Sequence, residues 1–258
     1  MNKSKKYFAT TVAIVLLIMM VVPAISQEPR EPWKDARLFD AVAAGRKDIV
    51  EVALAAGKDP NTRSPYWGSL LMYATAKQHL DIIKLLLAHG ADPKAKGNEA
   101  LLLGAINAKR MDILKCLVEA GALVTKPKDA RYFDDFLVAA GGNGEIVEYL
   151  LQHGVDPKGT ESICGETALQ MAAARGDVDV MKMLLDAGAD INHRDWNGMS
   201  ALMLACQKGQ QAAVEFLLAH GADPSFKDGY DRTAETFASQ LKGENAEKLR
   251  VLCAGKKQ

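Results

Sequence analysis

The sequence predicts an all-α solenoid, a stack of about seven helix-turn-helix units joined by β-hairpin-like turns. The first observation is a glycine that recurs every 31 to 34 residues, most often in the phrase Gly-Ala-Asp. These glycines are Gly57, Gly90, Gly121, Gly154, Gly188 and Gly221. A period near 33 is typical of stacked units that cannot bury their apolar faces alone. The second observation is composition: the chain is 48% hydrophobic but only 6% aromatic, which favours short helices packed through small side chains.

The N-terminus carries a separate signal. A lysine-bearing start leads into an apolar run over residues 12–22, and small residues follow at Ala24 and Ser26. This pattern is typical of a cleaved signal peptide, with the cut expected after Ser26. The alternative is a retained membrane anchor, but the apolar run is shorter than the ~20 residues that span a bilayer.

The predicted organisation is a signal peptide over residues 1–26, a linker over 27–34 and a repeat domain over 35–258. The repeat domain would hold about six full repeats and a C-terminal capping half-repeat. Cleavage would place the mature chain in the periplasm or outside the cell. The absence of an Asn-x-Ser/Thr acceptor after Gln27 favours a bacterial periplasm over a glycosylating secretory pathway.

Charge argues against nucleic acid as a ligand. The whole chain has 32 basic and 32 acidic residues. Without the three lysines of residues 1–26, 29 basic residues remain against 32 acidic ones. Because no basic stripe is present, the chain lacks the electrostatic footprint of a nucleic-acid-binding protein.

The clearest unit spans residues 165–190. Thr167 stands where its hydroxyl can cap a short helix, and Gly176 can end that helix in a left-handed conformation. A longer helix is expected over residues 178–187, and the segment 190–198, rich in Asp, Asn and Gly, predicts a hairpin. Helical spacing predicts that the buried residues are Leu169, Ala172 and Ala173 on the first helix and Val180, Met181, Leu184 and Leu185 on the second.

This order of elements resembles the ankyrin repeat. The likeness is carried by residues 167–170 and 200–203, which stand where the family has Thr-Pro-Leu-His, and by the Leu-Leu pairs at 184–185 and 217–218. The tetratricopeptide repeat has a similar period but no nine-residue hairpin between units. The resemblance implies a module for protein–protein recognition, without naming a partner.

The same pattern places seven units along the chain. The first three units are expected to open at residues 36–39, 69–72 and 100–103, and the fourth at Phe136. The fifth and sixth should centre on Leu169 and Leu202, and the seventh should start at Thr233. The junction between the third and fourth units departs most from the pattern, because residues 122–135 lack the hairpin start and Asp134 and Asp135 replace the Thr-Pro pair. The charged segment 242–258 is expected to form a polar cap.

The histidines do not predict a metal site. His89, His153 and His220 share one slot in alternate units, so neighbours would lie ~20 Å apart, too far for one metal ion. We expect each to interact with carbonyl groups of the last helical turn. His79 is expected to bond to backbone in an inter-helix turn, and His193 to lie at the surface of a hairpin. With no catalytic arrangement or phosphate-binding loop either, we expect no enzyme activity and no cofactor. An enzyme with an unrecognised site is the alternative.

The four cysteines do not form an obvious disulfide framework. Only Cys206 and Cys253 fall in neighbouring units, whereas Cys116 and Cys164 have no near partner in the stack. The prediction is therefore that the cysteines act as small buried hydrophobic residues.

The hairpins are the candidate binding surface, since exposed Trp and Tyr are enriched among binding hot spots. The predicted partner-binding residues are Arg63, Tyr66, Trp67, Arg194, Trp196, Phe226, Lys227 and Tyr230. The sequence thus predicts a monomeric, non-catalytic module that binds a partner protein through its hairpins and short helices, with no membrane contact beyond the signal segment. Two alternatives stay open: an anchored scaffold facing the periplasm, and an inhibitor or immunity-type protein that binds a toxin or enzyme.

Overall fold

The computed structural model describes residues 36–95, 97–98, 101–124, 136–160, 163–242 and 244–254. The predicted signal peptide and linker, and Asp134 and Asp135, lie outside these ranges. By its internal contacts the chain divides into two parts, Met1–Arg37 and Leu38–Gln258. The larger part contains the repeat units.

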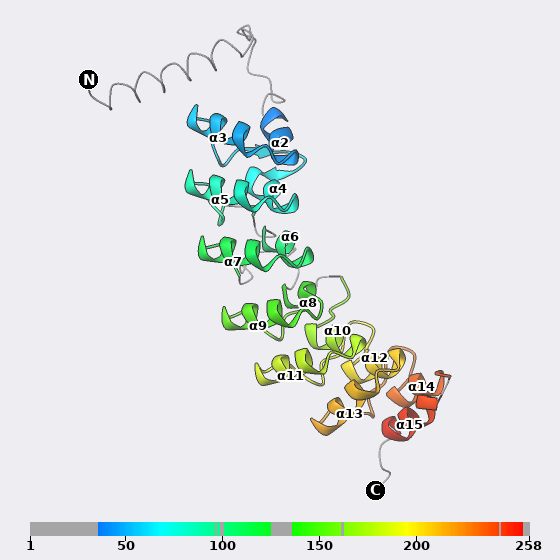
Figure 1. Ribbon diagram of the computed structural model, residues 1–258. Coiled ribbons are helices and arrows are strands. Elements are labelled where there is room, and N and C mark those ends of the chain that lie inside the picture. The colour runs from blue at the N-terminus through cyan, green and yellow to red at the C-terminus, as the bar shows by residue number, and fades with distance from the viewer. Residues whose placement is uncertain are drawn as a thin grey trace, which may run out of the picture. The chain divides into compact units, whose positions relative to one another are not determined.

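The described part of the chain forms seven consecutive helix pairs (Figure 1). The first helix of each pair is α2 (Ala36–Ala43), α4 (Leu70–Ala76), α6 (Leu101–Asn107), α8 (Phe136–Ala140), α10 (Ala168–Arg175), α12 (Ala201–Lys208) or α14 (Ala234–Ser239). The second is α3 (Lys47–Ala55), α5 (Leu80–Ala88), α7 (Met111–Glu119), α9 (Gly144–Gln152), α11 (Val178–Asp186), α13 (Gln211–Ala219) or α15 (Glu244–Cys253). This confirms the predicted solenoid of helix-turn-helix units.

Local signals set the helix boundaries of the α10–α11 pair as predicted. The Thr167 hydroxyl accepts a hydrogen bond from the backbone N–H of Gln170, and the Gln170 side chain accepts one from the backbone N–H of Thr167. This reciprocal capping box satisfies two N–H groups that would otherwise lack partners. Gly176 ends α10 in the left-handed region, with φ of 81°. Of the predicted face, Leu185 is only half-buried, whereas the other six residues are buried.

Neighbouring units pack first helix on first helix and second helix on second helix. Among first helices, α4 contacts α6, α6 contacts α8, α8 contacts α10, α10 contacts α12 and α12 contacts α14. Ala172 and Ala205, both buried at equivalent positions of α10 and α12, keep these helices thin enough to pack closely. Gln170 adds a polar link between units, because its side-chain amide donates to the Met199 carbonyl at 2.7 Å. The result is a hydrophobic core that continues from one unit to the next.

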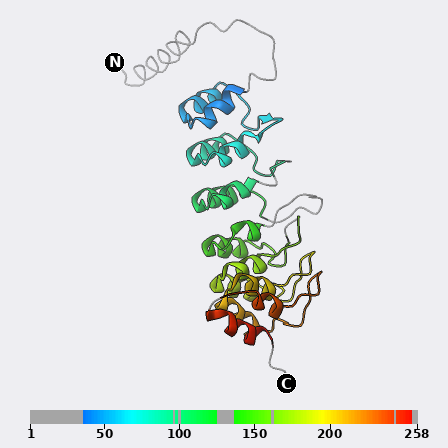
Figure 2. The same cartoon turned by 90° about the vertical axis from the view of Figure 1, so that its right-hand side faces the viewer.

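Where the structure describes them, the connections between units lie on one side of the stack (Figure 2). In one of them β1 (Arg63–Ser64) pairs antiparallel with β2 (Gly68–Ser69). Single antiparallel bridges join Thr160 to Thr167 and Arg194 to Ser200 at equivalent hairpins further along. Each hairpin therefore ends at the residue that caps the following first helix.

The seventh unit contains a full helix pair. The predicted half-repeat with a polar tail instead continues into α15, which buries Leu249 and Cys253. Among the described helices, none has the length and apolar character required to cross a bilayer.

The structure corrects the cysteine prediction for one pair. Cys206 of α12 and Cys253 of α15 form a disulfide, with their Cα atoms 7.7 Å apart. Cys116 and Cys164 take no part in this disulfide and are both half-buried. The sequence placed this pair in neighbouring units but not in bonding contact, because that contact depends on where α15 lies relative to α12.

This pairing predicts a thiol count. The chain unfolded in guanidinium chloride without reductant is expected to react with Ellman's reagent at two thiols, and at four after reduction. A Cys253→Ser variant should show three thiols under both conditions. Four reactive thiols in the unreduced wild-type chain would show that Cys206 and Cys253 are not joined.

Candidate functional site

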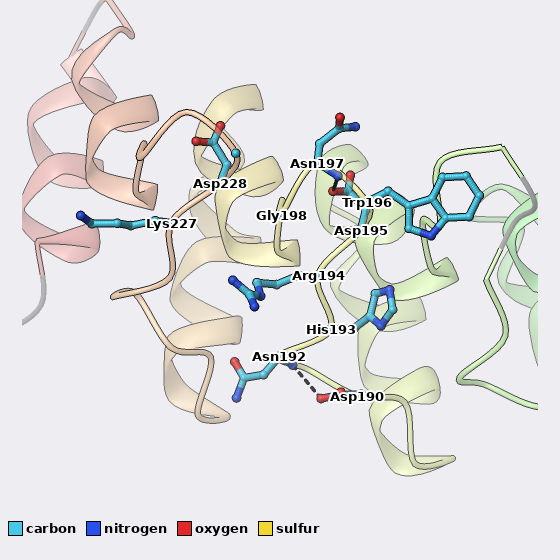
Figure 3. A pocket seen from close by; sticks show the side chains of 11 residues that line it. Asp190, Asn192, His193, Arg194, Asp195, Trp196, Asn197, Gly198, Lys227 and Asp228 are labelled. Carbon is cyan, nitrogen blue, oxygen red and sulfur yellow. Dashed lines mark hydrogen bonds between the residues drawn. The ribbon is translucent and has the colours of Figure 1, made fainter.

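An open groove of about 570 Å³ lies between two neighbouring hairpins near the C-terminal end of the stack (Figure 3). We call residues 190–200 the Trp196 hairpin and residues 223–233 the Tyr230 hairpin. The groove, named the hairpin groove, is lined by residues between Asp190 and Gly198 and by Lys227, Asp228 and Gly229. Its walls therefore come from hairpins that precede α12 and α14, and its lining is mostly polar.

Backbone hydrogen bonds connect three successive hairpins at their tips. The N–H of Trp196 donates to the Cys164 carbonyl at 3.0 Å, and the N–H of Gly229 donates to the Asn197 carbonyl at 2.8 Å. The first bond joins the Trp196 hairpin to the preceding hairpin, and the second joins it to the Tyr230 hairpin. These bonds fix the hairpins relative to one another, so the surface they present is ordered before any ligand binds.

An aspartate holds each of the two hairpins in shape. Asp195 and Asp228 occupy equivalent positions, and the carboxylate of each accepts two backbone N–H bonds from the residues two and four positions further on, all within 2.9 Å. Asp228 also pairs with Arg232, whose guanidinium lies 2.6 Å away. Burial raises the pKa of the Asp228 carboxyl, but the hydrogen bonds from Arg232 and from the backbone outweigh it, so the pKa lies below its usual value.

Three of the predicted binding residues, Arg194, Trp196 and Lys227, line the hairpin groove, and a fourth, Phe226, contacts Arg194. Trp196 is 72% exposed, and its indole lies close to Gly165 of the preceding hairpin, where a β-carbon would meet the indole nitrogen at 2.6 Å. The Arg194 guanidinium lies 5.2 Å from the centre of the Phe226 ring, a cation–π distance. Lys227 makes an exposed ion pair of 3.5 Å with Asp231. Phe226 itself is half-buried against the core, so it supports Arg194 instead of contacting solvent freely.

Tyr230 lies on the next hairpin tip and is 79% exposed. The guanidinium of Arg232 lies 5.0 Å from the centre of its ring and 4.7 Å from that of Phe237. Tyr230 is therefore held from one side by Arg232 while its other side faces solvent.

The other three predicted residues belong to the β1–β2 hairpin, several units away along the stack. Tyr66 is exposed, whereas Trp67 packs against the rings of Phe39 and Tyr73, with ring centres 5.6 and 5.1 Å away. The Arg63 guanidinium lies over Gly97 of the following hairpin. These contacts give Trp67 and Arg63 structural roles, and the binding role of this hairpin stays a prediction.

On the described hairpins, sequence reasoning missed the exposed apolar residue Ile163, which is 80% exposed. It stands four residues before the helix cap Thr167, as Trp196 stands four residues before the cap Ser200. Aligning the two caps would have found it. Ile163 and Trp196 thus occupy equivalent tip positions on consecutive hairpins.

His153, His193 and His220 each bond to a backbone carbonyl. The ring nitrogens of His153 and His220 lie 2.8 Å from the carbonyl oxygens four residues earlier, as predicted. His193 was expected to face solvent, but its Nε2 lies 3.0 Å from the Gly165 carbonyl, where it links two hairpins. Within the described ranges, no group of three or more metal-ligating side chains comes together.

The fold and this hairpin surface define a class: a solenoid of helix pairs with a row of ordered hairpins. The family model for ankyrin repeats (three copies) matches residues 38–128 and 136–228. The chain therefore belongs to the ankyrin repeat family, and its fold is that of a protein–protein interaction module.

Two curated proteins match this chain over part of its repeat region. Human diacylglycerol kinase iota is 33% identical over 105 residues, and the rat protein is 32% identical over the same length. These matches cover 39% of this chain but span only about a tenth of the length of either kinase. They bear on the repeats and not on the kinases' activity.

Two solved structures share the fold. The ankyrin repeat domain of human ASB11 matches with a TM-score of 0.71 and 23% identity, covering 89% of this chain and all of that domain. The ankyrin repeat domain of Bcl-3, a member of the IκB protein family, matches with a TM-score of 0.65 and 22% identity over the same shares. At these identities the likeness concerns the fold alone.

Proposed function

We propose that this chain is an exported, non-catalytic ankyrin-repeat protein that binds a partner protein through its hairpins. The observation that carries the proposal is the ordered tip surface near the C-terminal end, where Ile163, Trp196 and Tyr230 are exposed on three hairpins joined by backbone bonds. Large exposed apolar side chains on a rigid support are what a protein-binding surface requires.

Export rests on the N-terminal sequence. The lysine-bearing start, the apolar run and the small residues before Gln27 favour a signal peptide, which would deliver the repeats to the periplasm or the medium. The mass of the chain purified from its native host tests this: a chain that begins at Gln27 supports cleavage. A retained N-terminus would favour the anchored form.

A Trp196→Ala variant tests the binding surface. The full chain is used to capture partners from the native compartment, and the bound proteins are identified and their affinities measured. Loss of an exposed aromatic anchor is expected to lower the affinity for the partner by about 30-fold or more. Circular dichroism should be unchanged, because the backbone bond of Trp196 to Cys164 does not involve the ring.

The matched control is Val52→Ala, which removes an exposed apolar side chain from α3, far from the hairpin groove. It should leave capture unchanged. If Trp196→Ala and Val52→Ala both leave the partner bound at full affinity, the hairpin tips are not the binding surface.

A further inference from the structure

The hairpin groove contains Arg194, a cation that forms no ion pair with any residue in the described ranges. Its guanidinium instead lies over the Phe226 ring. The side chain is exposed at the surface of the groove. The ring holds the guanidinium in place without neutralising it, so its N–H donors remain available to an incoming anion.

The acidic residues of the groove do not supply that anion. Asp195 is buried and its carboxylate accepts two backbone N–H bonds, while Asp228 is buried and paired with Arg232. Asp190 accepts the backbone N–H of Asn192 at 2.9 Å, the bond drawn in Figure 3. Each carboxylate is thus committed to hairpin structure.

A second cation stands nearby in a weak pair. Lys227 and Asp231 lie 3.5 Å apart, and both side chains are well exposed to solvent. Exposed pairs of this kind contribute little to stability, so Lys227 can exchange Asp231 for a ligand carboxylate at small cost. Arg194 and Lys227 therefore form the positive side of the hairpin groove.

Trp196 adds an apolar surface on the opposite side of the same hairpin. Figure 3 shows Arg194 extending toward the segment with Lys227, whereas Trp196 points the other way. One compact ligand cannot use both side chains. A segment of a few residues in extended conformation, at ~3.3 Å per residue, can cross from one to the other.

We propose that the hairpin groove binds an acidic, extended segment of the partner protein, with a carboxylate paired to Arg194 and a neighbouring apolar side chain on Trp196. This inference rests on the proposed protein-binding function. A nucleic acid would fit less well, because its repeated phosphates would lie close to Asp190, Asp195, Asp228 and Asp231, whereas one carboxylate can address Arg194 alone.

The test uses a phage-displayed library of random 12-residue peptides selected on the full chain. The expected result is enrichment of peptides that carry Asp or Glu beside an apolar residue. The best peptide and its counterpart with Asp or Glu changed to the amide are then labelled with fluorescein and titrated by anisotropy.

Arg194→Gln is expected to lower the affinity for the acidic peptide by about tenfold and to leave the affinity for the amide peptide unchanged. The control Arg46→Gln makes the same charge change at the exposed ion pair with Asp48 at the start of α3, and should alter neither affinity. Equal thermal midpoints for the wild-type chain and Arg194→Gln confirm that the fold is intact.

Several results would overturn the inference. They are the absence of any Arg194-dependent peptide, enrichment of basic peptides, or tighter binding of a labelled 12-nucleotide oligouridine that also depends on Arg194. The two proposals separate in the partner capture experiment. If the captured partner needs Trp196 but not Arg194, protein binding stands and the acidic segment is wrong; if it needs neither, both are wrong.

Discussion

Replacing Asp228 by alanine is expected to lower the free energy of unfolding by about 3 kcal/mol, because a buried, paired carboxylate is removed. The variant leaves the backbone N–H groups of Tyr230 and Arg232 without their acceptor, and it leaves the Arg232 guanidinium without its partner. Urea denaturation followed by circular dichroism measures the loss. The Asp231→Asn variant, which changes an exposed carboxylate of the same hairpin, should stay within about 0.5 kcal/mol of the wild-type chain.

The same carboxylate predicts a pH dependence. The folded pKa of Asp228 lies below that of the unfolded chain, so its contribution to stability is fully present above the unfolded value of about 3.9. The contribution is lost as the pH falls below that value toward the folded pKa. Asp228→Asn should therefore lose less stability than the wild-type chain between pH 5 and about pH 3. Parallel stability curves for the two proteins would show that Asp228 does not carry this effect.

Local sequence signals predicted the features that depend on nearby residues, such as the ends of helices. Thr167 and Gly176 set the ends of α10 through bonds and dihedral angles within a few residues, so a single unit was enough to read them. The repetition of those signals then predicted the stack. The candidate site was predicted less completely, because the role of a hairpin residue depends on what the next unit places against it.

His193 and Arg63 illustrate why that dependence is hard to predict. His193 bonds to a carbonyl 28 residues earlier, and Arg63 lies over a glycine of the following hairpin. Neither contact has a signal in the hairpin's own sequence. Predicting such contacts requires the units to be aligned and stacked first, as the equivalence of Ile163 and Trp196 shows.

The two described tryptophans of the hairpins provide the sharpest contrast, and they predict opposite phenotypes. Trp67 is 44% exposed and contacts Phe39 of α2 and Tyr73 of α4, so its ring connects the first unit to the second. Trp67→Ala is expected to destabilise the chain by about 2 kcal/mol, less than for a fully buried tryptophan because part of the ring faces solvent. Trp196→Ala should stay within about 0.5 kcal/mol of wild type, since its ring is mostly exposed.

The part of the chain that loses stability should also differ between Trp67→Ala and Trp196→Ala. Each unit of a stack depends on its neighbours, so loosening Trp67 should expose the first unit before the rest of the array. Native-state hydrogen exchange is expected to show faster exchange of amides in α2 and α3 in Trp67→Ala, with α12 and α13 unchanged. If α2 and α3 keep their wild-type protection, the ring cluster does not hold the first unit. Trp67 would then be assigned, with Tyr66, to the binding surface. Partner capture by Trp67→Ala would decide between a structural role and a binding role for this ring.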